Sequence, residues 1–165
     1  TSGEYAEKCA LLRKYFHNPA LTTDVIVGFP METEEDFRES YNFVDNIHFY
    51  ETHIFKYSRR HGTKAATMGG QLTEAKKAER SDKMLELNEK HAKEYEQSML
   101  GQVLKVLLEE ETEINGQKWY VGHSMEYIKT AVKKNNEYKI NDIVQVKVCD
   151  FLEEHMLTGQ VLKAW

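Results

Sequence analysis

The chain has 165 residues, of which 41% are hydrophobic and 30% are charged, and its formal net charge is −5. This length is enough for one ordinary domain or for two small ones. The sequence contains neither a run of about 18 apolar residues nor a charged-then-apolar leader, so we expect no membrane span, no secretory signal and a cytoplasmic location. The acidic balance is atypical of strongly basic nucleic-acid-binding proteins.

Cysteine, histidine and arginine are unevenly placed. Cys9 and Cys149 have no second cysteine at metal or redox spacing, and the seven histidines include no HxxxH or HExxH pair. We therefore expect no metal site made by this chain alone. All the arginines precede position 81, whereas eight lysines and ten acids follow position 97. Contacts that need a planar guanidinium group must come from the first part of the chain.

The first elements indicate an α/β arrangement. Residues 4–16 place apolar side chains on one helical stripe, and residues 20–27, "ALTTDVIV", are typical of a short buried strand. The stripe consists of Tyr5, Cys9, Leu12 and Phe16.

A second helix and strand follow at once. Thr33 and Asp36 form a capping-box pattern that predicts a helix start, and residues 50–58, "YETHIFKYS", predict the next strand. The helix should face inward with Phe37, Tyr41, Val44 and Ile47. Helix, strand, helix and strand with short connections predict parallel strands joined by right-handed crossovers.

The second half of the chain changes its period. After a loop at residues 59–70, residues 72–98 predict a long charged helix, with Leu85, Ala92, Tyr95 and Met99 on one stripe. From Gly101 onward apolar and polar residues alternate in five short segments separated by turn signals. This pattern is typical of a small five-stranded barrel, so we predict two domains, 1–97 and 98–165.

The stretch "DVIVGFPMETEEDF" marks a candidate ligand site. Ligands of α/β sheets bind at the carboxyl ends of strands, and residues 28–32 lie at such an end. Gly28 would let the backbone approach a ligand, and the peptide N–H groups of the turn could bind a carboxylate or phosphate. The alternative is a strand-to-helix turn that merely requires glycine and proline.

Two further groups of residues have the chemistry of nucleic-acid contacts. The loop after the second strand contains Lys56, Arg59, Arg60, His61 and Lys64, which suit an anion or an RNA phosphate, although a solvated loop has the same composition. The barrel segment contains Trp119, Tyr120, His123, Tyr127 and Lys129, which suit base stacking beside lysines, although aromatics at alternate positions also form cores.

At these residues the chain resembles the carboxy-terminal half of the MiaB-like radical S-adenosylmethionine methylthiotransferases. "TTDVIVGFPMETEEDF", "FKYSRRHGTKAATM" and "GHSMEYIKTAV" are similar to three motifs of that family, the last of them in its TRAM domain. The TTDV start, His53 before Ile54 and Phe55, and Met68 most resemble the subgroup that thiomethylates N6-threonylcarbamoyladenosine beside the tRNA anticodon. The isopentenyladenosine-tRNA and ribosomal-protein subgroups of the family are alternatives.

The resemblance implies a fold, cofactors and a partner. The fold is the end of a partial (β/α) barrel followed by a TRAM barrel that binds tRNA. The cofactors are S-adenosylmethionine and two [4Fe–4S] clusters, whose CxxxCxxC and other cysteine ligands do not occur in this sequence. The chain is therefore interpreted as a fragment that is inactive alone, because the cluster must reduce the sulfonium.

The resemblance also assigns residues. The cofactor pocket would be lined by Asp24, Val25, Val27, Gly28, Phe55, Lys56 and Tyr57. The substrate or RNA would be met by Arg59, Arg60, His123, Tyr127 and Lys129. The resemblance identifies no catalytic side chain in this chain.

Three departures from the family pattern concern the loops at this site. Met31 replaces a glycine, Lys64 replaces a proline, and Gly69-Gly70 replaces a Pro-Asp pair. A side chain at position 31 costs about 1 kcal/mol if the backbone there has a positive φ.

An isolated part of a parallel sheet leaves strand edges unpaired, so we expect the chain to dimerise through them or to leave its first helix and strand poorly ordered. The rival to an enzyme fragment is a non-catalytic RNA-binding module.

Overall fold

The computed structural model describes residues 1–164, which form two compact units. The first unit is Thr1–Ala92, and the second begins at Lys93. The long helix α4 (Glu74–Ser98) runs through the boundary. None of the helices in residues 1–164 is long and apolar enough to cross a membrane. The assignment of functional domains to 1–97 and 98–165 stays a prediction.

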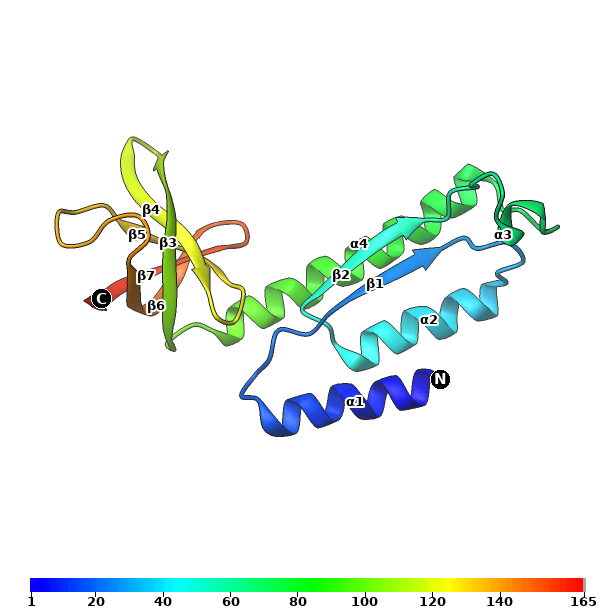
Figure 1. The fold of residues 1–165 in the computed structure, drawn as a ribbon, viewed down its shortest axis with the longest axis horizontal. Helices are drawn as coiled ribbons and strands as arrows, with labels where there is room; N and C mark the ends of the chain where they lie inside the picture. Colours follow the sequence, from blue (N-terminus) through cyan, green and yellow to red (C-terminus); the bar gives the residue numbers. More distant parts are fainter. Residues whose placement is uncertain (165) are drawn as a thin grey trace. The chain divides into compact units, whose positions relative to one another are not determined.

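The first unit alternates helices and strands, as predicted. Its elements before α4 are α1 (Ser2–Tyr15), β1 (Thr22–Val27), α2 (Glu34–Ile47), β2 (Glu51–Lys56) and the short α3 (Lys64–Thr67) (Figure 1). The two strands pair in parallel, with Thr22 opposite Glu51 and Val27 opposite Lys56. The predicted parallel pairing is confirmed. The described residues contain two strands of such a sheet, and the larger barrel implied by the resemblance stays a prediction.

Helix α2 begins as its sequence predicts. The Thr33 hydroxyl accepts from the backbone N–H of Asp36, and the Asp36 carboxylate accepts from the backbone N–H of Thr33 at 2.8 Å. This capping box satisfies backbone donors that a helix start otherwise leaves free. The predicted inward face is confirmed, because Phe37, Val44 and Ile47 are buried and Tyr41 is half-buried.

The core of the first unit lies on one face of the strand pair. Its buried members come from α1, β1, α2 and α4 and from the segments just before β1 and β2. They are Cys9, Leu21, Val27, Phe37, Val44, Ile47, Phe49, Met84 and Leu87. Val25 and Ile54 of the two strands pack against this cluster from the same face. The helices therefore cover one side of the pair.

Two predicted helix stripes differ from the structure. On α1, Cys9 is buried, but Tyr5, Leu12 and Phe16 are 41%, 42% and 60% exposed. The reason is that α1 has only part of one face against the rest of the unit, where the Tyr5 ring stacks on Phe43 with centroids 5.9 Å apart. On α4, Leu85 is 49% exposed. Met84, one position earlier, is buried instead, whereas Ala92 and Met99 are buried as predicted, so the predicted α4 stripe was wrong in its first member.

The second unit is a closed five-stranded barrel, as predicted. Its strands are β3 (Val103–Ile114), β4 (Gln117–Ser124), β5 (Lys129–Lys133), β6 (Ile143–Glu153) and β7 (Met156–Ala164). They close in the order β3-β4-β5-β7-β6, with all pairs antiparallel except β5 and β7. Asn115 and Gly116, both at positive φ, form the hairpin turn between β3 and β4.

Two glycines permit the strands to cross closely. A Cβ atom on Gly122 would lie 1.7 Å from the carbonyl oxygen of Leu107, and one on Gly159 would lie 2.1 Å from the carbonyl oxygen of Lys147. A residue with a side chain cannot occupy either position without displacing backbone, so these glycines determine how tightly the barrel closes.

Candidate functional site

The carboxyl ends of β1 and β2 lie side by side. Val27 is the partner of Lys56 in the register, and the next backbone N–H, that of Tyr57, donates to the carbonyl oxygen of Val27 at 2.8 Å. The sequence thus brings the predicted residues of both strand ends together. In parallel sheets this edge is where ligands bind.

One face of the strand pair is uncovered in the described residues. Asp24 is opposite His53, and Ile26 is opposite Phe55, so these four side chains share a face. Ile26 is 59% exposed and Phe55 is 52% exposed. Of the residues predicted to bind a cofactor, Asp24, Phe55 and Lys56 are exposed. This face offers an apolar surface flanked by the carboxylate of Asp24 and the imidazole of His53.

The other face of the pair belongs to the core. Val25 is half-buried and Val27 is 2% exposed within the helix-covered cluster. The side chain of Val27 therefore contributes to the stability of the unit, and its carbonyl oxygen is occupied by Tyr57. A cofactor contact through Val27 stays a prediction that the packing does not favour.

The backbone N–H groups after β1 already have an acceptor. Gly28 and Phe29 donate to the same carboxylate oxygen of Glu32, at 2.7 and 3.0 Å. The sequence suggested that these groups could bind an external carboxylate or phosphate. In the structure the anion is supplied by the chain itself, four residues farther on.

Gly28 is required by packing as well as by backbone conformation. Its φ is +75°, and a Cβ atom there would lie 2.2 Å from Cγ of Lys77. Lys77 is 6% exposed and donates to the carbonyl oxygen of Tyr57 at 3.0 Å. The aliphatic part of the Lys77 side chain thus lies against the turn after β1, and its ammonium group binds the backbone just after β2. The sequence left open whether this turn binds a ligand or only connects a strand to a helix, and these contacts favour the structural connection.

The departures at Met31 and Gly70 are coupled. Met31 has φ +70°, the strained conformation anticipated from the glycine that the family has at this place. Its backbone N–H donates to the carbonyl oxygen of Gly70 at 2.8 Å. A Cβ atom on Gly70 would lie 2.8 Å from Cγ of Met31. A side chain at position 31 is therefore accommodated by the absence of one at position 70.

A buried arginine that sequence reasoning missed organises the turn. Arg80 on α4 has a side chain 3% exposed and donates to Glu32 Oε1 at 2.7 Å and to Glu34 at 2.9 Å. It also donates to the carbonyl oxygens of Glu32 and Thr33, both at 3.1 Å. Its contact with Glu32 spans 48 positions, which no local pattern reveals. The available signal was that Arg80 is the only arginine after Arg60.

The predicted anion-binding loop after β2 is partly used by the loop itself. The Nε atom of Arg59 donates to the carbonyl oxygen of Ala66 at 2.7 Å, and the carbonyl oxygen of Arg60 accepts from Thr63. A shallow hollow of about 660 Å³ is lined by Arg59, His61 and Lys64, among others. The structure therefore brings three of the five predicted cations to one hollow.

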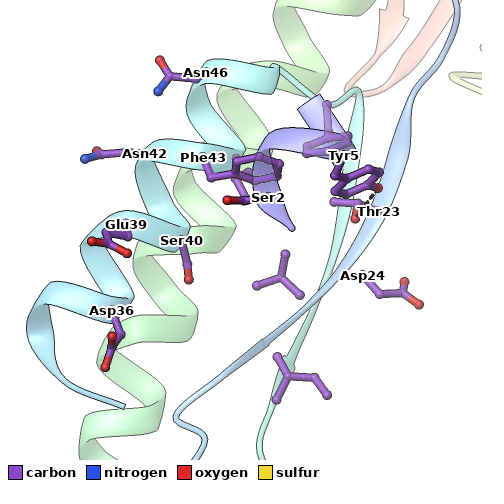
Figure 2. A pocket seen from close by; sticks show the side chains of 14 residues that line it. Ser2, Tyr5, Thr23, Asp24, Asp36, Glu39, Ser40, Asn42, Phe43 and Asn46 are labelled. Atoms are coloured by element: carbon purple, nitrogen blue, oxygen red, sulfur yellow. Dashed lines mark hydrogen bonds between the residues drawn. The ribbon is translucent and has the colours of Figure 1, made fainter. Parts of the chain in front are cut away.

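A larger hollow of about 770 Å³ lies along β1 (Figure 2). It is lined by Tyr5 and Ser2 of α1, by residues 23–26 of β1 and by polar side chains of α2. The Tyr5 hydroxyl donates to the Thr23 hydroxyl at 3.0 Å across one end. Asp24 and Val25 are the predicted cofactor residues that line it. Within the described residues β1 pairs only with β2, so the hollow borders an unpaired strand edge.

The predicted RNA residues of the barrel are brought together. His123 on β4 is the register partner of Lys129 on β5, and the His123 ring stacks on the Tyr127 ring with centroids 5.4 Å apart. A nitrogen of His123 lies 2.6 Å from the carboxylate of Glu109. Tyr127 is 61% exposed and has φ +63°. The arrangement presents a stacked pair of rings beside a lysine on the barrel surface.

The two cysteines lie in different units. Cys9 is buried in the first core and Cys149 is exposed on the barrel, where its thiol lies 3.7 Å from the carbonyl oxygen of Thr158. The chain therefore provides no set of clustered thiolates of the kind that iron–sulfur clusters require.

Comparison with known proteins agrees with the resemblance seen in the sequence. A scan against models of protein families gave no match. The threonylcarbamoyladenosine tRNA methylthiotransferase MtaB of Bacillus subtilis is 41% identical over 145 residues, which are 87% of this chain and 32% of the relative. The tRNA-2-methylthio-N(6)-dimethylallyladenosine synthase of Methylacidiphilum infernorum is 39% identical over 78% of this chain and 27% of its own length. The ribosomal protein uS12 methylthiotransferase RimO of Clostridium acetobutylicum is 33% identical over 93% of this chain and 35% of its own length.

These relatives are enzymes that install methylthio groups. The chain belongs to the methylthiotransferase family, and it spans about a third of the length of the curated relatives that it matches. The resemblance predicted from the sequence motifs is confirmed at the level of the family.

Proposed function

We propose that the chain is the carboxy-terminal part of a radical S-adenosylmethionine enzyme that transfers a methylthio group to C2 of N6-threonylcarbamoyladenosine beside the tRNA anticodon. The observation that carries this proposal is the 41% identity with MtaB over 87% of the chain. The dimethylallyladenosine and ribosomal-protein relatives match at 39% and 33%, so those substrates are the alternatives within the family.

The strand ends are suited to part of the cofactor. When bound, S-adenosylmethionine supplies the radical and the methyl group. The exposed ring of Phe55 offers a surface for an adenine, and Lys56 offers a cation for a carboxylate. Asp24 can accept hydrogen bonds from ribose hydroxyls. Gly28 and Tyr57 would support these groups through the turn and its contact with Lys77.

The residues present do not fit an iron–sulfur cluster. Cys9 and Cys149 belong to different units, and each cluster needs several thiolates converging on one point. We therefore expect the 165-residue chain to be inactive alone, and no step of the reaction is assigned to its side chains.

The barrel would hold the tRNA. The stacked rings of His123 and Tyr127 beside Lys129 suit an unpaired base and its phosphate. Arg59 and Arg60 in the first unit would contact the RNA backbone or the cofactor carboxylate. A partner of this kind implies the cytoplasmic location expected from the sequence.

The experiment that tests the reaction is mass spectrometry of tRNA nucleosides from cells with and without the gene. We expect loss of the 2-methylthio derivative of threonylcarbamoyladenosine on deletion. Loss of the dimethylallyl counterpart instead would keep the reaction and change the substrate. An unchanged nucleoside profile would contradict the proposed tRNA reaction.

A second candidate function is RNA binding without chemistry, favoured by the surface cluster on the barrel. Calorimetry with S-adenosylmethionine and filter binding with tRNA separate the two functions in the intact chain. Heat of binding with the cofactor supports the enzyme, whereas tRNA binding sensitive to Tyr127→Ala without any cofactor binding supports the module.

Pairing of the chain with a second copy, through the strand edges of β1 and β2 that have no partner in the described residues, stays a prediction. Light scattering of the purified chain measures it. A monodisperse monomer whose residues 21–27 have protected amides would contradict the dimer.

A further inference from the structure

A hollow on the barrel lies apart from the His123, Tyr127 and Lys129 cluster. Its volume is about 490 Å³, within the range of small-molecule sites. Its lining includes Trp119 of β4, Lys133 of β5, Tyr138, Cys149 of β6, and Gly159 and Gln160 of β7. Trp119 is one of the aromatic residues that the sequence offered for base stacking, but neither the motifs nor the comparisons assign a role to the hollow itself.

The hollow follows from the way in which the barrel closes. β5 and β7 pair in parallel through two register positions, Thr130 with Leu157 and Ala131 with Thr158. β5 continues to Lys133, which has Trp119 of β4 as its partner, while β7 continues along β6. The end of β5 and the middle of β7 therefore border an open seam.

Trp119 supplies an unused hydrogen-bond donor at this seam. Its ring is 7% exposed and packs with Ile114, Val121, Ala131 and Met156. Its indole N–H is buried and has no acceptor among the described residues. A buried donor without a partner costs free energy that an acceptor brought by a ligand recovers.

The ammonium group of Lys133 lies near the Trp119 ring, where a ligand would have to move it aside and could then pair with it. Its Nζ atom lies 6.0 Å from the centroid of the Trp119 ring. Such a contact of an exposed lysine is weak, so the side chain can leave the ring. The backbone at this point is fixed, because the Tyr138 hydroxyl donates to the carbonyl oxygen of Lys133 at 2.6 Å. A movable ammonium group on a fixed strand suits a phosphate.

We propose that this hollow is a subsite for one unpaired nucleotide of a bound RNA, with a base carbonyl accepting from Trp119 and the phosphate paired with Lys133. The inference rests on the proposed binding of RNA by the barrel. Lys129 and Lys133 lie at the two ends of β5, about 13 Å apart along a strand. A single RNA strand lying along β5 therefore reaches both the stacked rings and the hollow.

The test uses the full chain with Trp165→Phe, so that Trp119 is the only tryptophan. A fluorescein-labelled single-stranded oligouridylate reports total binding by anisotropy. Trp119 fluorescence and the rate of Cys149 alkylation by iodoacetamide report the hollow, since Cys149 is exposed there and Cys9 is buried. We expect RNA to quench Trp119 and to slow alkylation of Cys149 several-fold.

Variants separate the two contacts. Trp119→Phe keeps an aromatic ring but removes the N–H, and we expect about five-fold weaker binding. Lys133→Ala should also weaken binding and lower the salt slope by about one. Lys118→Ala, on an exposed lysine of β4 that lines no part of the hollow, is the matched control and should change neither.

Each outcome decides between the two ideas. If RNA binds in a Tyr127-dependent manner while Trp119 fluorescence and Cys149 alkylation do not change, the subsite is wrong and RNA binding by the barrel stands. If the oligonucleotide and tRNA both fail to bind, the subsite and the proposed RNA-binding role fail together. The alkylation readout needs no substitution at the hollow, so a misfolded variant cannot decide the result.

Discussion

Arg80→Met tests whether the buried guanidinium holds the turn after β1 in place. Arg80 has a side chain only 3% exposed and ion-pairs with Glu32, whose own side chain is 13% exposed. Methionine keeps an unbranched side chain but leaves the carboxylate and two backbone carbonyls without their donor. Removing one partner of a buried ion pair costs about 3–5 kcal/mol. Because Glu32 still accepts hydrogen bonds from the N–H groups of Gly28 and Phe29, we expect the free energy of unfolding to fall by about 3 kcal/mol, the lower end of this range.

Urea unfolding followed by far-ultraviolet circular dichroism measures this loss, because the helices of the described part of the chain lie within residues 2–98. Arg38→Met is the matched control: its side chain is 69% exposed and lies 3.8 Å from Glu35, so about 0.5 kcal/mol or less is expected. Adding Glu32→Gln to Arg80→Met should recover part of the loss, since a neutral amide needs no cation. A loss for Arg80→Met no larger than that of the control would refute the reasoning.

Three other substitutions probe separate features. Gly122→Ala forces a Cβ atom to 1.7 Å from a carbonyl oxygen of β3, so we expect the barrel to lose about 3 kcal/mol or more of its free energy of unfolding, measured by tryptophan fluorescence. Gly69→Ala is the control and should be nearly neutral, because a Cβ atom there has no neighbour within 4 Å. Lys64→Pro should raise the free energy of unfolding in urea by about 0.4–1 kcal/mol, because Thr63 before it is already extended at ψ 150° and position 64 is the first of its helix. A lower free energy of unfolding would contradict this. Burial holds the pKa of His91 below its usual value, so the folded chain disfavours the protonated ring and the free energy of unfolding should fall as pH drops below about 6.5. His91→Gln should flatten this pH dependence, and an unchanged dependence would show that His91 does not cause it.

Local signals predicted the elements well because each depends on residues that are close in sequence. Thr33 and Asp36 are three positions apart, and their capping box is present. Alternation after Gly101 predicted the strands of the barrel, and the closed order confirms it.

Long-range contacts were not predictable in this way. The stripe on α4 was misplaced at Leu85 because periodicity identifies a face only to within a neighbouring position, and the position of the other elements determines which one is buried. The contact between Arg80 and Glu32 joins residues 48 positions apart. The sequence placed a candidate site at Gly28, but the carboxylate that occupies its N–H groups could be recognised only once the turn had a structure.

Because Gly28 and Lys77 are in contact, a substitution at one of these distant positions requires a compensating substitution at the other. Any residue larger than glycine at position 28 needs a shorter side chain at position 77, and a shorter side chain there loses the bond to the carbonyl oxygen of Tyr57. Grafting the Gly-Phe-Pro turn into another scaffold would therefore require transplanting this turn of α4 with it. Among homologous sequences, the identity of residue 77 should vary together with that of residue 28.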